Sequence, residues 1–274
     1  MLELPEVVTI GRQMNEALTG KTVARAARGN TTHKWFFCNV GEEEFAQALG
    51  GKSVTGCSGD GKWMVMRLTG GTALLIGDMG GRVSLIADEG SLPKKHHLLV
   101  AFDDGSYLAV AMQMWGFANV TTEAELGAHW ALAGISPMSA EFTYDAFKAI
   151  MDRYEAPEKN SAKAFLVQRP TITGIGNGYA QDILFRARIH PTRKVATIPT
   201  KERRQLYNAI KSVLKDAVRL GGRDTERDLF GKPGRYVPTL DKRALGKPCP
   251  ACGTTVQKIQ FLGGAAYFCA SCQT

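Results

Sequence analysis

Apolar positions follow a helical period at the start of the chain. They recur every three or four residues over residues 6–18, which predicts one amphipathic helix. The apolar stripe consists of Val7, Ile10, Met14 and Leu18. Pro5 stands near the first turn and Gly20 follows the last one, as is typical of helix ends.

After this helix the pattern changes to short β-type runs. Glycine and aspartate turns separate them, as in Leu68-Thr-Gly-Gly71 and Phe102-Asp-Asp-Gly105. The predicted strands cover residues 52–57, 62–68, 72–77, 81–87, 97–102 and 106–112. Short strands at this spacing favour an antiparallel β-sandwich within residues 22–115.

The second half of the chain returns to helical patterns. A break at Ser136-Pro137 and a turn through Arg169-Pro170 interrupt them, and residues 154–160 read as a linker. The predicted helices cover about 122–130, 140–153, 177–187 and 201–220. Gly221-Gly222 ends the last of these helices.

Charge is unevenly distributed. Residues 151–274 hold 22 Lys and Arg against 10 Asp and Glu, whereas residues 1–150 hold 12 against 16. A basic half of this kind suggests a polyphosphate partner, most simply nucleic acid, although a solvated basic surface would look the same. No apolar run reaches the roughly 20 residues that a membrane span needs. We therefore expect a soluble protein without membrane association.

Four of the six cysteines lie in the last 26 residues. Cys249-Pro-Ala-Cys252 and Cys269-Ala-Ser-Cys272 are separated by sixteen residues, enough for one β-hairpin. Two such knuckles supply the four thiolates of a tetrahedral zinc site. The alternative is two disulfides. The absence of a signal-peptide pattern and the isolation of Cys38 and Cys57 favour a structural zinc ribbon.

These parts stand in a recognisable order. Met1-Leu-Glu-Leu-Pro-Glu-Val7, the β-sandwich, a basic half with Gly174-Ile-Gly-Asn-Gly-Tyr179 and the ribbon resemble the formamidopyrimidine-DNA glycosylase and endonuclease VIII family. The resemblance covers essentially the whole chain. It implies a helix-two-turns-helix DNA-binding fold and base-excision chemistry on damaged DNA.

The resemblance also implies catalytic residues. The family normally exposes a proline amine as its nucleophile, because an α-amine loses its proton more readily than a lysine does. Leu2 occupies that position, and its bulk is expected to protect Met1 from removal. Glu3 matches the family's acid. Lys62 matches a phosphate-binding lysine and is also a substitute Schiff-base donor, although the spacing alone favours a surface lysine at the entry to a strand.

Enzymes that rotate a base out of a duplex must fill the gap it leaves. Met79 matches the first of the family's intercalating residues. In a second loop, Gln113 stands where the family has arginine and Trp115 where it has phenylalanine. Met79 and Trp115 would equally suit the sandwich core. If the resemblance holds, all three side chains contact DNA beside the lesion.

Further DNA contacts are expected in the basic half. Gly174 and Gly176 allow backbone amides to approach a phosphate at the start of the next helix, where Asn177 stands. Lys163 and Asn177 are the expected phosphate contacts. At the ribbon tip, Gly264 occupies the position of a family arginine, so one charged contact is lost, and the backbone amide of Gly264 is the expected DNA contact there.

The sequence thus predicts an α+β fold: an N-terminal helix and antiparallel β-sandwich (1–120), a helix-two-turns-helix domain (121–240) and a zinc ribbon (241–274). The predicted function is a DNA glycosylase, with or without AP lyase activity, acting as a monomer on double-stranded DNA with a damaged or abasic site. The expected location is cytoplasmic and nucleoid-associated. A catalytically inactive binder of damaged DNA and an RNA- or ribosome-associated binder are the alternatives. The glycine-rich segment 221–234 is expected to close over an extruded base.

Overall fold

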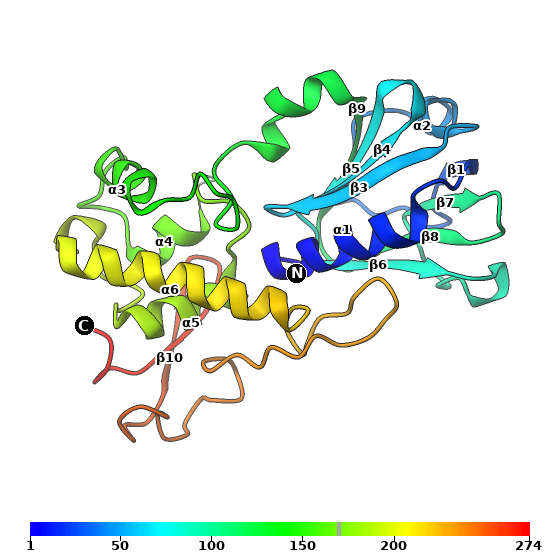
Figure 1. Ribbon diagram of the computed structural model, residues 1–274. Helices are drawn as coiled ribbons and strands as arrows, with labels where there is room; N and C mark the ends of the chain where they lie inside the picture. Colours follow the sequence, from blue (N-terminus) through cyan, green and yellow to red (C-terminus); the bar gives the residue numbers. More distant parts are fainter. Residues whose placement is uncertain (169–170) are drawn as a thin grey trace. The chain divides into compact units, whose positions relative to one another are not determined.

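The computed structural model describes residues 1–168 and 171–274, and it divides into two compact units (Figure 1). The sandwich unit comprises residues 1–133 and 218–236, and the ribbon unit comprises residues 134–217 and 237–274. The turn predicted through Arg169-Pro170 lies outside the described residues. The three-domain boundaries taken from the sequence stay a prediction.

The sandwich unit contains two β-sheets and two helices. The helices are α1 (Leu4–Leu18) and α2 (Glu42–Leu49). The strands are β1 (Val23–Arg28), β2 (Phe36–Cys38), β3 (Val54–Asp60), β4 (Trp63–Leu68), β5 (Thr72–Gly77), β6 (Gly81–Ile86), β7 (Leu98–Phe102), β8 (Tyr107–Met112) and β9 (Gly116–Thr122). Short 3₁₀ turns lie at Thr69–Gly71, Glu89–Ser91, Glu123–Ala128 and Trp130–Leu132.

One sheet has the strand order β1-β7-β8-β6 and the other β2-β9-β5-β4-β3. Neighbouring strands are antiparallel except for β2 and β9, which pair in parallel with Phe36 opposite Gly116. The turn between β5 and β6 and the loop between β8 and β9 each join one sheet to the other. The sandwich predicted from the spacing of the short strands is confirmed.

Helix α1 packs against β3, as Figure 1 shows for the dark blue helix. Its buried stripe includes Val7, Ile10, Met14 and Leu18, all in the core cluster formed with both sheets. Gly11 allows the helix to approach closely, because a Cβ there would lie 2.4 Å from the Gly59 amide nitrogen. The helix therefore lies against the sheet with its first turn fixed by packing.

The ribbon unit is helical with a terminal hairpin. Its elements are α3 (Tyr144–Asp152), α4 (Ala162–Val167), α5 (Asn177–Ala187), α6 (Thr200–Arg219, whose last two residues belong to the sandwich unit), a 3₁₀ turn (Val195–Thr197), β10 (Gln257–Phe261) and β11 (Gly264–Phe268). Ser161 caps α4 by accepting a hydrogen bond from the Ala164 amide at 3.1 Å. Among the described residues, no helix is both long and apolar enough to cross a membrane.

Two details differ from the sequence-based prediction. The helix expected at about 122–130 is a pair of 3₁₀ turns, because its apolar residues are too few to bury a full helical face. Helix α2 and strands β1, β2 and β9 were not predicted, since their patterns are short and mixed. Strand β9 lies between β2 and β5 in its sheet, so its pairing depends on partners distant in the sequence.

Candidate functional site

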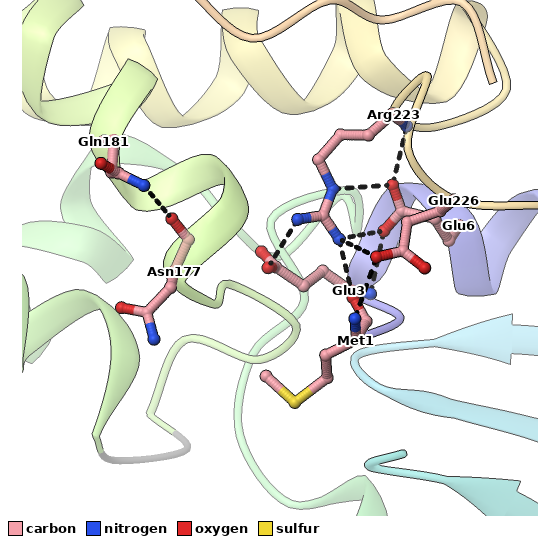
Figure 2. A network of polar contacts seen from close by, with 7 residues as sticks. All are labelled: Met1, Glu3, Glu6, Asn177, Gln181, Arg223 and Glu226. Carbon is pink, nitrogen blue, oxygen red and sulfur yellow. Dashed lines mark hydrogen bonds and ion pairs between the residues drawn. The ribbon is translucent and has the colours of Figure 1, made fainter. Parts of the chain in front are cut away.

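The beginning of α1 carries a buried cluster of charged groups (Figure 2). The Glu3 side chain is 2% exposed, and its Oε1 lies 3.3 Å from Nη1 of Arg223. Glu6 accepts a hydrogen bond from the Glu3 amide at 2.9 Å and another from the Arg223 amide at 2.9 Å. Both glutamates therefore share one arginine as their counter-charge, and that arginine comes from the segment after α6.

The chain terminus belongs to the same cluster. The Met1 amine lies 2.9 Å from Glu226 Oε1, and Arg223 Nη2 donates to the Met1 carbonyl oxygen at 2.7 Å. Arg223 Nη2 also lies 3.5 Å from Glu226 Oε1. Three carboxylates thus face two cations, and the N-terminal amine is held by a carboxylate rather than presented alone.

Leu2 is almost fully buried in the sandwich core. Its amide donates to the Met79 carbonyl oxygen at 3.1 Å, in the turn between β5 and β6. With Met1 in place this nitrogen is an amide in a backbone hydrogen bond, so it has no free electron pair to attack a sugar. Leu2 anchors the N-terminus to the sandwich.

Lys62 precedes β4, and its Nζ lies 3.2 Å from Asp78 Oδ1. The two are also joined through the backbone, because the Asp78 amide donates to the Lys62 carbonyl oxygen at 2.9 Å. The Lys62 side chain remains a quarter exposed. It is therefore a partly accessible cation beside the turn that holds Leu2.

The two residues expected to intercalate from different loops have different environments. Met79 is fully buried within the core cluster, so contact with a duplex would require it to leave the core. Trp115 is 38% exposed. Gln113 lies on the same exposed loop, and its amide donates to the Gly80 carbonyl oxygen at 2.7 Å. Trp115 and Gln113 are accessible, whereas Met79 is a core residue in this structure.

In the ribbon unit, α5 begins at Asn177 after the glycine-rich stretch. The Asn177 side-chain Oδ1 is buried and has no hydrogen-bond partner within the described part of the chain. Gln181, one turn later, donates to the Asn177 carbonyl oxygen at 3.0 Å (Figure 2). Its side-chain oxygen accepts from the Tyr267 amide at 2.6 Å. Gln181 therefore joins the start of α5 to strand β11.

Lys163 on α4 is buried, and its ammonium donates to the Phe261 carbonyl oxygen at 2.6 Å. Burial lowers the pKa of Lys163 from its ordinary value, because the charged form loses hydration. Phe261 ends β10 at the hairpin tip. The side chain expected to contact phosphate thus holds the hairpin in this structure.

The residues at the hairpin tip have no charged side chains, so the tip offers only backbone groups to a ligand. Leu262 and Gly263 form the turn, both with positive φ, and β11 starts at Gly264. A Cβ at position 264 would lie 3.1 Å from the Asn177 Nδ2 atom, which is the end of a side chain and can shift. The tip is therefore adjacent to the start of α5.

The four cysteines of the two knuckles come together. The sulfur atoms of Cys249, Cys252, Cys269 and Cys272 all lie within 4.8 Å of one another. Four thiols at this separation, brought together by two tight turns, match the donor set of a structural zinc site and form no disulfide. The predicted ribbon geometry is confirmed.

Known proteins agree with this architecture along the whole chain. Family models match as "Formamidopyrimidine-DNA glycosylase N-terminal domain" over residues 1–114, "Formamidopyrimidine-DNA glycosylase H2TH domain" over 133–228 and "Zinc finger found in FPG and IleRS" over 246–274. The formamidopyrimidine-DNA glycosylase of Chloroflexus aurantiacus is 30% identical over 280 residues, covering 100% of this chain and 98% of the relative. The chain belongs to the formamidopyrimidine-DNA glycosylase family.

Other relatives support the assignment. The formamidopyrimidine-DNA glycosylase of Cytobacillus firmus is 30% identical over 284 residues, with full coverage of both chains. A solved Lactococcus lactis Fpg bound to abasic-site DNA has a TM-score of 0.87 at 24% identity, over 99% of each chain. The MutM (Fpg) protein of Thermus thermophilus has a TM-score of 0.83 at 25% identity, over 99% of this chain and 98% of that one. The fold is that of the family, and the ribbon is its structural zinc site.

Sequence reasoning missed two members of the N-terminal cluster. Arg223 and Glu226 were placed only in a charged, glycine-rich segment. A signal existed, because two acidic residues at the buried start of α1 require a cation, and the described residues supply Arg223 for that purpose. The position of this arginine, some 220 residues later in the chain, could not be read from the sequence.

Segment 221–234 is held to the sandwich, since the Leu85 amide donates to the buried Leu229 carbonyl oxygen at 3.0 Å.

Proposed function

We propose that this protein is a DNA glycosylase of base-excision repair that removes a damaged base from double-stranded DNA. Membership of the formamidopyrimidine-DNA glycosylase family supports this function over the full length of the chain. The structural relatives include an Fpg bound to abasic-site DNA. The observation that carries the proposal is the position of Glu3, buried at the start of α1 beside an arginine.

Glu3 is proposed to act on the sugar of the damaged nucleotide. A carboxylate beside C1′ either accepts a proton from an attacking water or stabilises the positive charge that develops on the opening sugar. Arg223 fixes Glu3 from one side with its Nη1 group, and Glu6 fixes Arg223 through Nε at 3.3 Å. The cluster therefore orients the carboxylate before DNA arrives.

Strand cleavage requires a nucleophilic amine, and three nitrogens are candidates. The Leu2 nitrogen is a backbone amide donor to Met79, the Met1 amine is paired with Glu226, and Lys62 is paired with Asp78. The Leu2 nitrogen becomes an amine only if Met1 is removed, and the Met1 and Lys62 amines must each leave a carboxylate partner before they attack C1′. We infer that base release proceeds with water as nucleophile, so that AP lyase activity is weak or absent.

DNA is proposed to contact the ribbon unit at the start of α5 and the hairpin tip. The peptide N–H groups at a helix N-terminus and the backbone of a glycine turn bind phosphate without sequence preference. Asn177 and Gly264 lie at this position. Lys163 supports the tip from beneath, and its ammonium reaches phosphate only if its hydrogen bond to Phe261 is exchanged.

Base release tests the function directly. Oligonucleotide duplexes carrying formamidopyrimidine, or other oxidised or alkylated bases, are incubated with the protein and with Glu3→Gln. We expect release by the wild type and a loss of about 10²–10⁴-fold in the variant, the usual contribution of a positioned acid or base. Glu16→Gln, on the exposed face of α1, is the matched control. Release that is unaffected by Glu3→Gln would contradict the role of Glu3.

Borohydride trapping on abasic DNA tests the chemistry of the amine, together with intact-mass analysis of the N-terminus. No covalent adduct is expected from the wild type. An adduct that is lost in Lys62→Ala and kept in Leu2→Ala would instead identify Lys62 as a Schiff-base donor. Binding without release of any base would leave a damaged-DNA binder, and tighter retention on structured RNA than on duplex DNA at equal salt would favour RNA.

A further inference from the structure

The segment after α6 that supplies Arg223 to the charged cluster is itself tightly folded. We name residues 222–236 the site loop. Its two ends are joined through the backbone, because the Asp224 amide donates to the Tyr236 carbonyl oxygen and the Tyr236 amide donates to the Gly222 carbonyl oxygen, both at 2.9 Å. The site loop is therefore closed at its base, next to the arginine.

Glycine at position 234 permits this closure. A Cβ there would lie 2.2 Å from the Gly222 carbonyl oxygen and 2.5 Å from the Arg223 carbonyl oxygen. At those separations the backbone would have to move, so a side chain at position 234 would displace the arginine. The backbone of Gly234 thus packs against that of Arg223, whose side chain contacts Glu3.

The far turn of the site loop is fastened to α1 by one glutamine. Gln13 Nε2 donates to Asp228 Oδ2 at 2.9 Å, and Gln13 Oε1 accepts from the Leu229 amide at 3.0 Å. The other oxygen of Asp228 accepts from the Phe230 amide at 3.0 Å and from the Lys232 amide at 2.8 Å. Donor and acceptor of the glutamine amide are thus both used on the loop, and the carboxylate joins the turn to the helix.

Leu229 fixes the same turn to the sandwich. Its side chain is fully buried in the core cluster, and its carbonyl oxygen accepts from the Leu85 amide of β6 at 3.0 Å. Movement of the loop over a base would expose this leucine and break both hydrogen bonds to Gln13. Each of these changes is unfavourable. The contacts therefore oppose closure of the loop.

The two fastening points lie on one helix. Glu6 and Gln13 are seven residues apart, so they lie on the same face of α1 about two turns apart. Glu6 contacts Arg223 at one end of the site loop, and Gln13 contacts Asp228 at the other. The helix that begins beside Glu3 therefore also sets the position of the arginine that contacts Glu3 (Figure 2).

We propose that the site loop is a fixed wall of the active site, and that Gln13 and Asp228 are positioning residues that hold Arg223 against Glu3. This inference rests on the proposed function, in which Glu3 acts on the sugar of the damaged nucleotide. A carboxylate whose counter-charge is already in place needs no reorganisation when charge develops on the sugar. Loss of the link between α1 and the loop should therefore slow base release and leave DNA affinity nearly unchanged.

Reversing the polarity of the hydrogen bond tests the link. Gln13→Glu removes the donor and places two carboxylates together. Asp228→Asn places two amide donors together, because a flip of either amide would turn a donor toward a backbone N–H group. In the double variant the new asparagine donates to the new glutamate, and the Leu229 amide and the amides of the turn keep their acceptors. Its formal charge equals that of the wild type.

The measurement is kcat and KM for base release from duplexes with a damaged base. Each single variant should lower kcat by roughly tenfold or more, as small displacements of catalytic groups do, while KM stays within about twofold. The double variant should recover kcat to within about threefold of the wild type, since the pair acts as one coupled unit. Hydrogen exchange of the Leu229 amide should become faster in the single variants and return toward the wild-type rate in the double variant.

Glu16→Gln, on the exposed face of α1, is the matched control and should behave like the wild type. If Gln13→Glu does not fold, Asp228→Asn and the double variant still decide the question. A rise in KM at unchanged kcat, or a double variant no better than either single one, would overturn the inference. If the wild type releases no base from any duplex, the proposed function itself fails. If Glu3→Gln abolishes release while both single variants keep the wild-type kcat, only this inference fails.

Discussion

The N-terminal cluster and the start of α5 differ in whether their buried polar groups have partners. In the cluster, Glu3 and Glu6 receive a buried arginine from within the same chain. At α5, the Asn177 Oδ1 atom is buried without a partner in the described residues, and glycine stands at the adjacent hairpin position 264. One region is complete before DNA binds, whereas the other leaves hydrogen-bonding capacity for a ligand.

This difference separates chemistry from binding. A reacting carboxylate must have a fixed position, and fixing it with Arg223 removes the cost of reorganisation during the reaction. A phosphate contact does not need the same rigidity, because backbone N–H groups and the side-chain NH₂ of Asn177 are donors that can bind either water or a phosphate oxygen. We therefore expect substitutions in the cluster to affect stability and base release, and substitutions at α5 and the hairpin to affect affinity.

The largest expected effect is loss of zinc. Structural zinc contributes about 10–16 kcal/mol of binding free energy in small zinc domains, so Cys249→Ser or chelation should unfold the hairpin. Lys163 and Gln181 would then lose their partners at Phe261 and Tyr267. DNA affinity should fall by more than 100-fold, measured together with zinc content, while the sandwich unit stays folded. Cys38→Ser, outside the ribbon, should change neither quantity.

Removal of the arginine is the next largest change. Arg223→Ala leaves buried carboxylates without their counter-charge, which should lower the free energy of unfolding by about 3–5 kcal/mol. Arg223→Lys keeps the charge and loses the guanidinium fork, so it should be intermediate. Urea denaturation followed by circular dichroism measures both variants. Arg227→Ala, half-buried on the same segment, should cost less than 1 kcal/mol, as is usual away from buried ion pairs; a similar loss there would contradict the assignment.

A substitution at the hairpin tip tests whether the region around the start of α5 governs DNA affinity. Gly264→Arg should add one charged phosphate contact worth about 1.5–3 kcal/mol, or roughly 10–100-fold in affinity for abasic duplex. The salt dependence of binding should steepen by about one phosphate. Fluorescence anisotropy across a salt series measures both quantities, with Gly264→Gln as the uncharged control. An equal gain for the glutamine variant would show that charge is not the cause.

The smallest expected effect is a pH dependence of stability caused by His97 in the sandwich unit. Burial lowers the pKa of His97 below its ordinary value of 6.5, and neighbouring His33 and His96 lower it further. Its Nδ1 accepts a hydrogen bond from the Met112 amide at 2.9 Å, which requires that nitrogen to be unprotonated.

Because the unfolded chain protonates this histidine first, stability should fall as pH drops below about 6.5. His97→Asn should weaken this pH dependence of the melting temperature. A pH profile identical to that of the wild type would contradict the contribution of His97.

Much of the fold followed from local patterns. The period of α1, the six short strands and the spacing of the cysteines each depend on a few neighbouring residues, and the structure has them close to where they were predicted. Strand β9 was not predicted, because its residues are mixed in polarity. The sequence did not distinguish core from surface positions for Trp115 and Met79. The packing of the sandwich leaves Trp115 exposed and buries Met79.

The sequence by itself determined the architecture, the zinc ligands and the family, because each is encoded in short-range periodicity or in motif spacing. Tertiary structure decided the rest: that Arg223 neutralises Glu3, that Lys163 holds the hairpin at Phe261, and that Trp35 and Trp115 line one cavity. These contacts join residues about 80 to 220 positions apart. They depend on how whole elements pack, and no local rule of spacing carries that information.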